Sequence, residues 1–217
     1  MVEFVNVSKN FGRISALNDV SFKIEKGEFV FIIGPSGSGK TTVLRLLLRE
    51  FPATSGKIMF DGIDITKLSK SKIPVLRQSI GVVFQDFKLL KEKTVGENIE
   101  MALAIKGVPK SEWETRKKEV LKLVGLANRS ELFPAQLSGG ELQRVAIARA
   151  MSTDPKIIFA DEPTGNLDWE TSEVIMELLD KINKAGKTII VTSHNLTIIK
   201  KMKKRTIKLV DGKVESK

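Results

Sequence analysis

The chain has 217 residues, 41% of them hydrophobic and 29% charged, which is typical of a globular protein with one sizeable core and excludes a largely disordered chain. Its 36 Lys and Arg outnumber its 26 Asp and Glu, and the resulting +10 charge favours an anionic partner, either nucleic acid or an anionic membrane surface. The absence of cysteine excludes disulfides, and no apolar run approaches the roughly 18 residues of a membrane span, so we expect a single cytosolic domain.

Two segments near the N-terminus, residues 2–7 and 20–24, alternate apolar and polar side chains as half-buried strands do. We expect them to pair in an antiparallel sheet. Phe11 lies between them, in what we predict to be a connecting loop without apolar neighbours. An exposed ring near a nucleotide site is suited to stacking on a purine, and a packing role for Phe11 is an equal alternative.

The glycine-rich stretch GPSGSGKTT, residues 34–42, follows the apolar run 29–33 and precedes the helical pattern 43–48. It fits the phosphate-binding pattern G-x-x-x-x-G-K-[ST], in which backbone amides surround phosphate oxygens. Lys40 would reach the terminal phosphates, and the Thr41 hydroxyl would be a Mg²⁺ ligand. The strand-loop-helix context argues against a chance glycine-rich turn. The residues expected to bind nucleotide here are Gly34, Pro35, Ser36, Gly37, Ser38, Gly39, Lys40, Thr41 and Thr42.

The pattern of residues 54–65 predicts two short strands around an Asp-Gly turn, and the apolar run 80–84 predicts a buried strand. Gln85 follows that strand directly. In a parallel sheet ligands bind at the carboxyl ends of the strands, so we expect Gln85 near the phosphate loop, where its amide carbonyl could ligate Mg²⁺. A capping or turn glutamine is the alternative that spacing leaves open.

Helical periodicity replaces strand patterns in the middle of the chain, over residues 95–105 and 111–124. We therefore expect a helical lobe over roughly residues 87–150. The α/β core would consist of roughly residues 1–86 and 151–217.

The stretch LSGGELQR occupies residues 137–144 and leads into a second helix rich in small apolar residues. Ser138 is a good N-cap, and Gly139 and Gly140 leave the amides of the first turn uncovered, which predicts a second anion-binding helix start. A single bound nucleotide does not need two anion-binding helix starts in the same chain. Two copies facing each other would use both.

A buried strand, residues 156–160, leads into Asp161 and Glu162. Because neighbouring strand residues point to opposite faces, we expect different roles: Asp161 as a Mg²⁺ ligand and Glu162 as the acceptor of a proton from an attacking water. A plain surface pair of acids is the alternative. The strand 188–193 ends at His194, the only histidine, which we expect to contact the terminal phosphate, although lone histidines are often ordinary surface or core residues.

The C-terminal part carries the densest basic cluster and a hairpin pattern over residues 207–214. A solvated surface is the favoured interpretation of the cluster, and a membrane-facing patch is the alternative. The cluster contains Lys200, Lys201, Lys203, Lys204, Arg205 and Lys208.

Taken together, these segments resemble the nucleotide-binding subunits of ATP-binding cassette (ABC) transporters over essentially the whole chain. GPSGSGKTT resembles Walker A, Gln85 the Q-loop, LSGGELQR the signature motif, IIFADE Walker B, Asn166-Leu167-Asp168 the D-loop and His194 the switch histidine. Phe11 takes the position of the family's adenine-stacking residue, commonly Tyr. The resemblance implies an α/β P-loop NTPase core with an N-terminal antiparallel β-subdomain and an inserted helical lobe.

The resemblance also implies an ATPase that uses ATP and Mg²⁺. By this resemblance the catalytic residues are Lys40, Gln85, Glu162 and His194, and the metal is held by Thr41, Gln85 and Asp161.

For the assembly, the resemblance implies an ATP-dependent homodimer. Walker A of one copy and Ser138, Gly139 and Gly140 of the other would contact the same triphosphate, with Asp168 at the seam. The helical lobe would move an integral membrane partner docked near Gln85 and residues 87–90. The protein would then lie peripherally on the cytoplasmic face of the inner membrane, held by that partner and helped by its basic surface.

Within the family, residues 161–168 are similar to the branch that contains the cell-division ATPase FtsE, the lipoprotein-release ATPase LolD and the MacB exporters, and residues 84–90 are most similar to FtsE. That resemblance implies a partner like the membrane protein FtsX and a role in controlling cell-wall hydrolases. The alternatives are a lipoprotein-release or export ATPase and a soluble DNA-repair or translation ATPase. The last usually carries an inserted module, for which 217 residues leave no room, so we expect no nucleic-acid partner.

Overall fold

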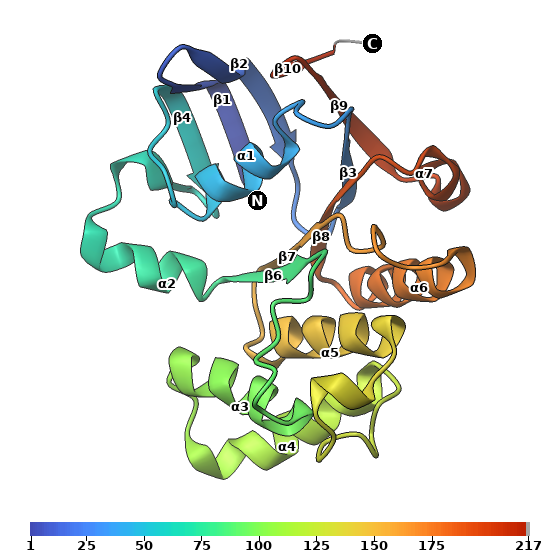
Figure 1. The fold of residues 1–217 in the computed structure, drawn as a ribbon. Coiled ribbons are helices and arrows are strands. Elements are labelled where there is room, and N and C mark those ends of the chain that lie inside the picture. Colours follow the sequence, from blue (N-terminus) through green and yellow to red (C-terminus); the bar gives the residue numbers. More distant parts are fainter. Residues whose placement is uncertain (216–217) are drawn as a thin grey trace.

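The computed structural model describes residues 1–215, whose strands form two sheets (Figure 1). The first sheet is antiparallel and has the strand order β2-β1-β4-β5. Its strands are β1 (Val2–Phe11), β2 (Ile14–Ile24), β4 (Ser55–Phe60) and β5 (Ile63–Asp64). The predicted pairing of the two N-terminal strands is confirmed, since Phe4 lies opposite Phe22. The predicted Asp-Gly turn is confirmed as well, because β4 and β5 pair across it.

The second sheet has the strand order β10-β9-β3-β8-β7-β6. Its strands are β3 (Phe29–Ile33), β6 (Ile80–Phe84), β7 (Ile157–Asp161), β8 (Thr188–Ser193), β9 (Arg205–Val210) and β10 (Lys213–Val214). All its pairings are parallel except that of β10 with β9, which forms the predicted C-terminal hairpin. The unbroken apolar runs of β3 and β7 reflect burial on both faces of a parallel sheet.

Helices cover the parallel sheet: α1 lies between the two sheets, and α5 and α6 pack on the opposite face (Figure 1). The helices are α1 (Lys40–Leu47), α2 (Ile73–Arg77), α3 (Val95–Lys106), α4 (Lys110–Leu123), α5 (Gly139–Ser152), α6 (Trp169–Lys184) and α7 (Leu196–Met202), with 3₁₀ turns at Ile65–Lys67, Lys70–Lys72 and Pro134–Gln136. Within residues 1–215, none of these helices has the length and apolar character that a membrane crossing requires.

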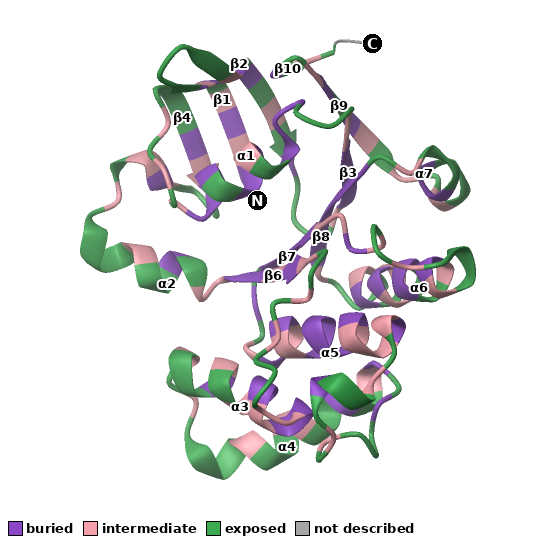
Figure 2. Ribbon diagram, viewed as in Figure 1, coloured by how far each residue is buried: buried purple, intermediate pink, exposed green. Residues whose placement is uncertain are grey.

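The buried apolar side chains form two clusters, one on each face of the parallel sheet. The central strands of that sheet are largely buried (Figure 2). Phe159 of β7 belongs to the cluster that includes Leu44 of α1 and Phe4 of β1. Its neighbour Ile158 belongs to the cluster that includes Ile147 of α5. This division follows from the strand itself, because successive side chains point to opposite faces.

The middle of the chain, residues 87–150, contains helices and turns and no strand. The two helices predicted there are confirmed as α3 and α4, and both pack on α5. Each of α3 and α5 begins with a reciprocal cap. Thr94 caps the amide of Glu97 and Ser138 caps that of Glu141, while each glutamate accepts a hydrogen bond from the backbone amide of its cap residue.

The carboxyl ends of four adjacent strands lie at one edge of the parallel sheet, because β3, β8, β7 and β6 are neighbours and run in the same direction. The phosphate-loop sequence follows β3, His194 follows β8 and Gln85 follows β6. Asp161 ends β7, and Glu162 comes next. Residues far apart in the chain therefore meet at this edge.

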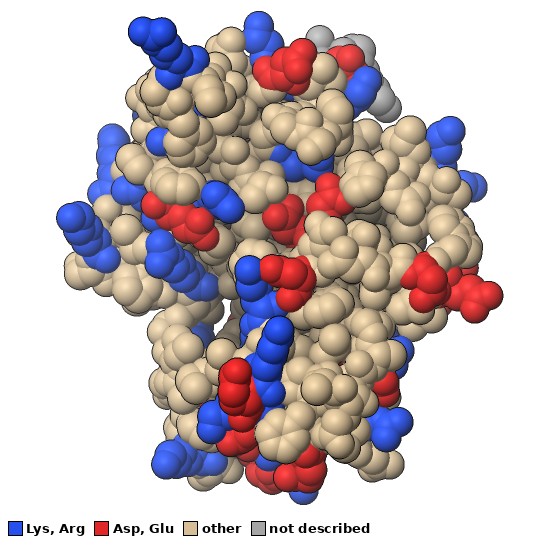
Figure 3. All heavy atoms as spheres, in the orientation of Figure 1, with Lys and Arg blue, Asp and Glu red and all other residues tan. Residues whose placement is uncertain are grey.

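Most of the C-terminal basic cluster is paired within the chain. Lys201 contacts Glu173 at 2.6 Å, Lys204 contacts Asp180 at 2.7 Å and Arg205 contacts Glu28 at 2.9 Å, while Lys208 pairs with Glu215. On the face drawn in Figure 3, basic and acidic side chains are interspersed. These contacts support the solvated-surface interpretation over a dedicated membrane patch.

We predict that Thr94→Ala lowers the free energy of unfolding by about 1 kcal/mol, because the hydroxyl that caps α3 is lost. Thr94→Ser keeps the hydroxyl and should retain nearly all of the stability. Urea unfolding followed by circular dichroism measures both. Equal stability of the Ala variant and the unchanged protein would contradict a capping contribution.

Candidate active site

The loop between β3 and α1 is shaped by glycines that allow close backbone approach. A Cβ at Gly34 would lie 2.1 Å from the carbonyl oxygen of Leu209, and one at Gly39 would lie 2.7 Å from the carbonyl oxygen of Ala16. Gly39 also precedes α1 with a φ of +103°, which other residues rarely adopt. The loop is thus pressed against two other segments, and a larger residue at either glycine would displace it.

Lys40 begins α1 and is almost completely buried, with 7% of its surface exposed. Its ammonium donates to the carbonyl oxygens of Gly34 at 2.8 Å and Pro35 at 3.0 Å, and lies 3.6 Å from a carboxylate oxygen of Glu162. The hydroxyl of Ser38 is also buried and has no hydrogen-bond partner among the described residues. A buried ammonium and an unused hydroxyl beside a helix N-terminus fit an anionic ligand.

Asp161 connects the phosphate loop to the centre of the parallel sheet. One of its carboxylate oxygens accepts a hydrogen bond from Thr41 at 3.3 Å, and the other accepts one from Thr192 at 2.6 Å. Two hydroxyls therefore hold this carboxylate beside the start of α1. One carboxylate and one hydroxyl form a small, hard oxygen donor set, as Mg²⁺ prefers when it keeps several ligands for water and phosphate.

Glu162 points to a different set of partners. Its carboxylate lies 3.6 Å from the ammonium of Lys40 and 2.6 Å from Nδ1 of His194. The two acids therefore contact different groups, and strand alternation is not the only cause of this separation; their chemical roles stay a prediction. Glu162 follows the end of β7 with a φ of +50°, and its amide donates to the Thr192 hydroxyl at 2.9 Å. Left-handed backbone at a non-glycine residue is costly and concentrates at functional sites.

Gln85 is held by a reciprocal pair of hydrogen bonds with Asn166. The side-chain amide of Gln85 donates to the side-chain oxygen of Asn166, and the side-chain amide of Asn166 donates to the backbone carbonyl of Gln85, both at 3.1 Å. Gly165 permits this approach, since a Cβ there would lie 2.7 Å from the Gln85 amide nitrogen. The segment after β7 thus positions the residue after β6.

These groups surround one cavity of about 650 Å³. Its lining brings together most of the predicted nucleotide site in one place: Pro35, Ser36, Gly37, Gly39, Lys40, Thr41, Thr42, Gln85, Glu162 and His194. Asp161 lies beyond Thr41, on an adjoining cavity that Thr41 and Gln85 also line. The cavity therefore joins a phosphate-type loop to a carboxylate that can accept a proton.

Several residues assigned to the same site do not line that cavity: Phe11, Gly34 and Ser38, and four residues of the signature and D-loop segments. Ser138, Gly139 and Gly140 lie at the start of α5, and Asp168 caps α6. The Ser138 hydroxyl serves the amide of Glu141, whereas the amides of Gly139 and Gly140 have no acceptor within their helix. Within one chain, the signature motif is separate from the phosphate loop.

The predicted surroundings of Phe11 are wrong. Phe11 is the last residue of β1 and pairs with Ile14, so it is not in a loop between separate strands. Its ring packs edge-to-face on Phe51 at 5.3 Å, and the ammonium of Lys9 lies 4.7 Å from its centroid. Phe51 is forty positions away in the sequence, so local inspection did not find this neighbour. The ring keeps 41% exposure, and its stacking on a purine stays a prediction.

Sequence inspection missed Thr192 and the partnership of Asn166 with Gln85. The Thr192 hydroxyl contacts both acids at the end of β7: it donates to Asp161 and accepts from the amide of Glu162. A hydroxyl next to the end of an apolar strand was a usable signal. Its two partners, however, depend on the pairing of β7 with β8.

Comparison with known proteins shows which family this chain belongs to. Residues 17–165 match the family model described as ABC transporter. The chain belongs to the ABC transporter family. This ABC chain is 46% identical to the cell division ATP-binding protein FtsE of Bacillus subtilis, over 98% of its own length and 93% of that protein. It is 42% identical to FtsE of Escherichia coli, over 98% and 96%.

Solved structures agree. A dimeric ATP-binding cassette, described as a post-hydrolysis state bound to ADP and phosphate, is 41% identical with a TM-score of 0.88, over 100% of this chain and 97% of that one. The CbiO1 cassette of Clostridium perfringens, part of an ABC transporter complex, is 30% identical with a TM-score of 0.92, over 99% and 86%. The chain is an ABC-type ATPase, and the predicted α/β P-loop fold is confirmed.

We predict that Thr192→Val lowers the maximal rate of ATP hydrolysis by about 10- to 100-fold, as loss of a group that orients site residues commonly does. Valine keeps the shape but removes the hydroxyl that holds Asp161 and the backbone of Glu162. Thr192→Ser should recover most of the rate. A phosphate-release assay measures this, and an unchanged rate in the Val variant would contradict the assigned role.

Proposed function

We propose that this ABC ATPase is the ATP-binding subunit of a cell-division complex, in which ATP-driven pairing of two copies acts on a membrane protein resembling FtsX. The observation that carries the proposal is the near-full-length similarity of 42–46% to proteins described as FtsE. The site geometry supports the ATPase part independently.

ATP binds with its phosphates in the loop before α1. The buried ammonium of Lys40 contacts the terminal phosphates, which replace or join the loop carbonyls that it now contacts. Thr41, Asp161 and Gln85 would hold Mg²⁺, and their hydroxyl, carboxylate and amide oxygens suit that ion. When bound, the ion neutralises charge that develops on the phosphates. Phe11 would stack on the adenine ring.

Glu162 is the group that accepts a proton from the attacking water. Its backbone is fixed by Thr192, so the carboxylate is held at the carboxyl end of the parallel sheet, facing the phosphate loop. His194 contacts the same carboxylate at 2.6 Å, and in the proposed complex it lies beside the terminal phosphate of ATP. Holding base, histidine and ammonium in fixed positions lowers the cost of orienting the water.

The site of one chain is half of the functional site. The start of α5 offers free amides and a helix dipole to an anion, yet it lies outside the nucleotide cavity of its own chain. In a symmetric dimer, Ser138, Gly139 and Gly140 of one copy contact the triphosphate held by the other, and Asp168 lies at the seam. Binding of ATP then favours association of two copies.

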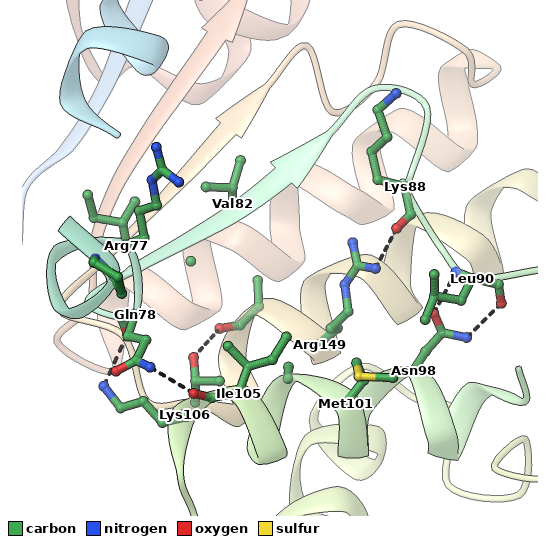
Figure 4. A pocket seen from close by; sticks show the side chains of 16 residues that line it. Arg77, Gln78, Val82, Lys88, Leu90, Asn98, Met101, Ile105, Lys106 and Arg149 are labelled. Atoms are coloured by element: carbon green, nitrogen blue, oxygen red, sulfur yellow. Dashed lines mark hydrogen bonds between the residues drawn. The ribbon is translucent and has the colours of Figure 1, made fainter. Parts of the chain in front are cut away.

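The membrane partner docks in a groove formed by α2, β6 and α3 (Figure 4). Exposed apolar side chains of Leu90, Met101 and Ile105 lie along it. Among the described residues its lining includes four cations, Arg77, Lys88, Lys106 and Arg149, and no acid. An amphipathic helix with an acidic edge is the complementary partner element.

A direct contact links this groove to the nucleotide site. Arg149 of α5 donates to the carbonyl oxygens of Phe87 and Lys88, at 2.9 and 2.5 Å, two and three positions beyond Gln85. Both Phe87 and Lys88 have left-handed backbones, which cost free energy and need outside support. Movement of the helical lobe, residues 87–150, against the core would therefore change the shape of the groove. Through that partner the ATPase lies peripherally on the inner face of the membrane.

We predict that Glu162→Gln keeps ATP binding but reduces ATP hydrolysis by at least about 100-fold, since general-base catalysis contributes about 10²–10⁴-fold. Because ATP then persists, the variant should accumulate as a dimer. Gel filtration with ATP and a phosphate-release assay measure the two effects. Glu119→Gln, at an exposed position of α4, is the matched control. Turnover like that of the unchanged protein would contradict the role of Glu162.

We further predict that Ile105→Asp abolishes co-purification with a co-expressed membrane subunit resembling FtsX, while ATP binding is unchanged. Ile105 is 66% exposed in the groove, and a carboxylate there opposes docking of an apolar, acidic-edged helix. The control is Ile63→Asp, since Ile63 is similarly exposed, at 57%, on β5 of the antiparallel sheet. Equal loss in both variants, or in neither, would contradict docking at the groove.

A further inference from the structure

Trp169, the first residue of α6, has 44% of its surface exposed. It is absent from the lining of the nucleotide cavity and of the partner groove. Tryptophan has a large apolar surface and is among the residues most enriched where protein partners gain binding energy. An exposed indole on a regular, well-capped helix is therefore a candidate contact for another protein surface.

The segment that carries Trp169 packs directly on the start of α5. A Cβ at Gly139 would lie 3.3 Å from the side chain of Leu167, and one at Gly140 would lie 2.4 Å from that of Thr171. Residues 167–171 and the signature glycines are thus in contact and belong to one local surface. Trp169 lies in this segment between Leu167 and Thr171, so a partner surface that covers the signature glycines also comes close to the backbone of Trp169.

The backbone under Trp169 is firmly held. The carboxylate of Asp168 accepts hydrogen bonds from the amide of Thr171 at 2.8 Å and from its hydroxyl at 2.7 Å. These two bonds hold the pKa of Asp168 below its usual value, so the cap is intact at neutral pH. An anchor on a pre-ordered backbone loses little conformational entropy when it is buried by a partner.

We infer that Trp169 is an anchor of the interface between two copies of this chain, buried when ATP brings them together. The inference rests on the proposed ATP-dependent dimer, in which the signature glycines beside Trp169 face the second copy. Two-fold symmetry brings one indole from each copy into the interface. A dimeric cassette similar to this chain over its whole length agrees with such pairing.

Tryptophan fluorescence tests burial directly, because the chain has two tryptophans. Trp113→Phe leaves Trp169 as the only reporter; Trp113 lies in α4, and its indole donates to Val108. In a Trp113→Phe, Glu162→Gln background with ATP, the emission should shift to shorter wavelength as protein concentration rises. The concentration dependence separates dimer formation from ATP binding to a single copy. Emission that does not change with protein concentration while dimers form would overturn the inference.

A second experiment measures the energetic contribution. In the Glu162→Gln background, Trp169→Ala should raise the dissociation constant of the ATP-bound dimer at least about tenfold, as loss of a central aromatic anchor does, with Trp169→Phe in between. Sedimentation velocity measures this. Ile63→Ala, which removes a similarly exposed apolar side chain from β5, should leave dimerisation unchanged. ATP binding to the dilute monomer and circular dichroism show that each variant is folded.

The outcomes separate this inference from the proposed function. Failure of the Glu162→Gln parent to dimerise with ATP would reject the dimer itself. A parent that dimerises and a Trp169→Ala variant that dimerises equally well would overturn only the role of Trp169. Loss of co-purification with the membrane subunit, without loss of dimerisation, would also overturn it and would assign the indole to the membrane partner.

Discussion

Parallel pairing of four adjacent strands is the constraint on which the rest of the site depends. The carboxyl ends of β3, β8, β7 and β6 end at one edge, so residues separated by more than one hundred positions meet there. The phosphate loop needs this arrangement as much as the acids do, because β3 is held on both sides, by β8 and β9. Burial of both sheet faces makes the edge rigid.

At that edge, a single hydroxyl positions two acidic residues that contact different partners. Thr192 fixes one oxygen of Asp161 and the backbone of Glu162, so the same hydroxyl sets the position of both acids. The left-handed backbone of Glu162 completes the separation. Its free-energy cost is offset by the two hydrogen bonds that its amide makes to β8, one to the Thr192 hydroxyl and one to its carbonyl.

The chain also presents two surfaces that its own fold leaves uncovered. One is the basic, apolar groove between α2 and α3, and the other is the region of the signature glycines and Trp169. Helix α5 connects them: its first residues are the signature glycines, and Arg149 near its end holds the turn after Gln85. A rigid helix between the surfaces provides a physical route by which pairing of two copies can be transmitted to a membrane partner.

The sequence by itself determined many of the strands and helices, the phosphate loop, the helix cap at Ser138 and the order of polar residues after buried strands, because periodicity, capping and glycine motifs are local. Only the tertiary structure decided which groups touch. The packing of Phe11 on Phe51, the pairing of Gln85 with Asn166 and the ion pairs of Lys201 with Glu173 and of Arg205 with Glu28 join residues 28 to 177 positions apart. Such contacts depend on strand order and on burial around each side chain, and neither quantity is encoded in a short window of residues.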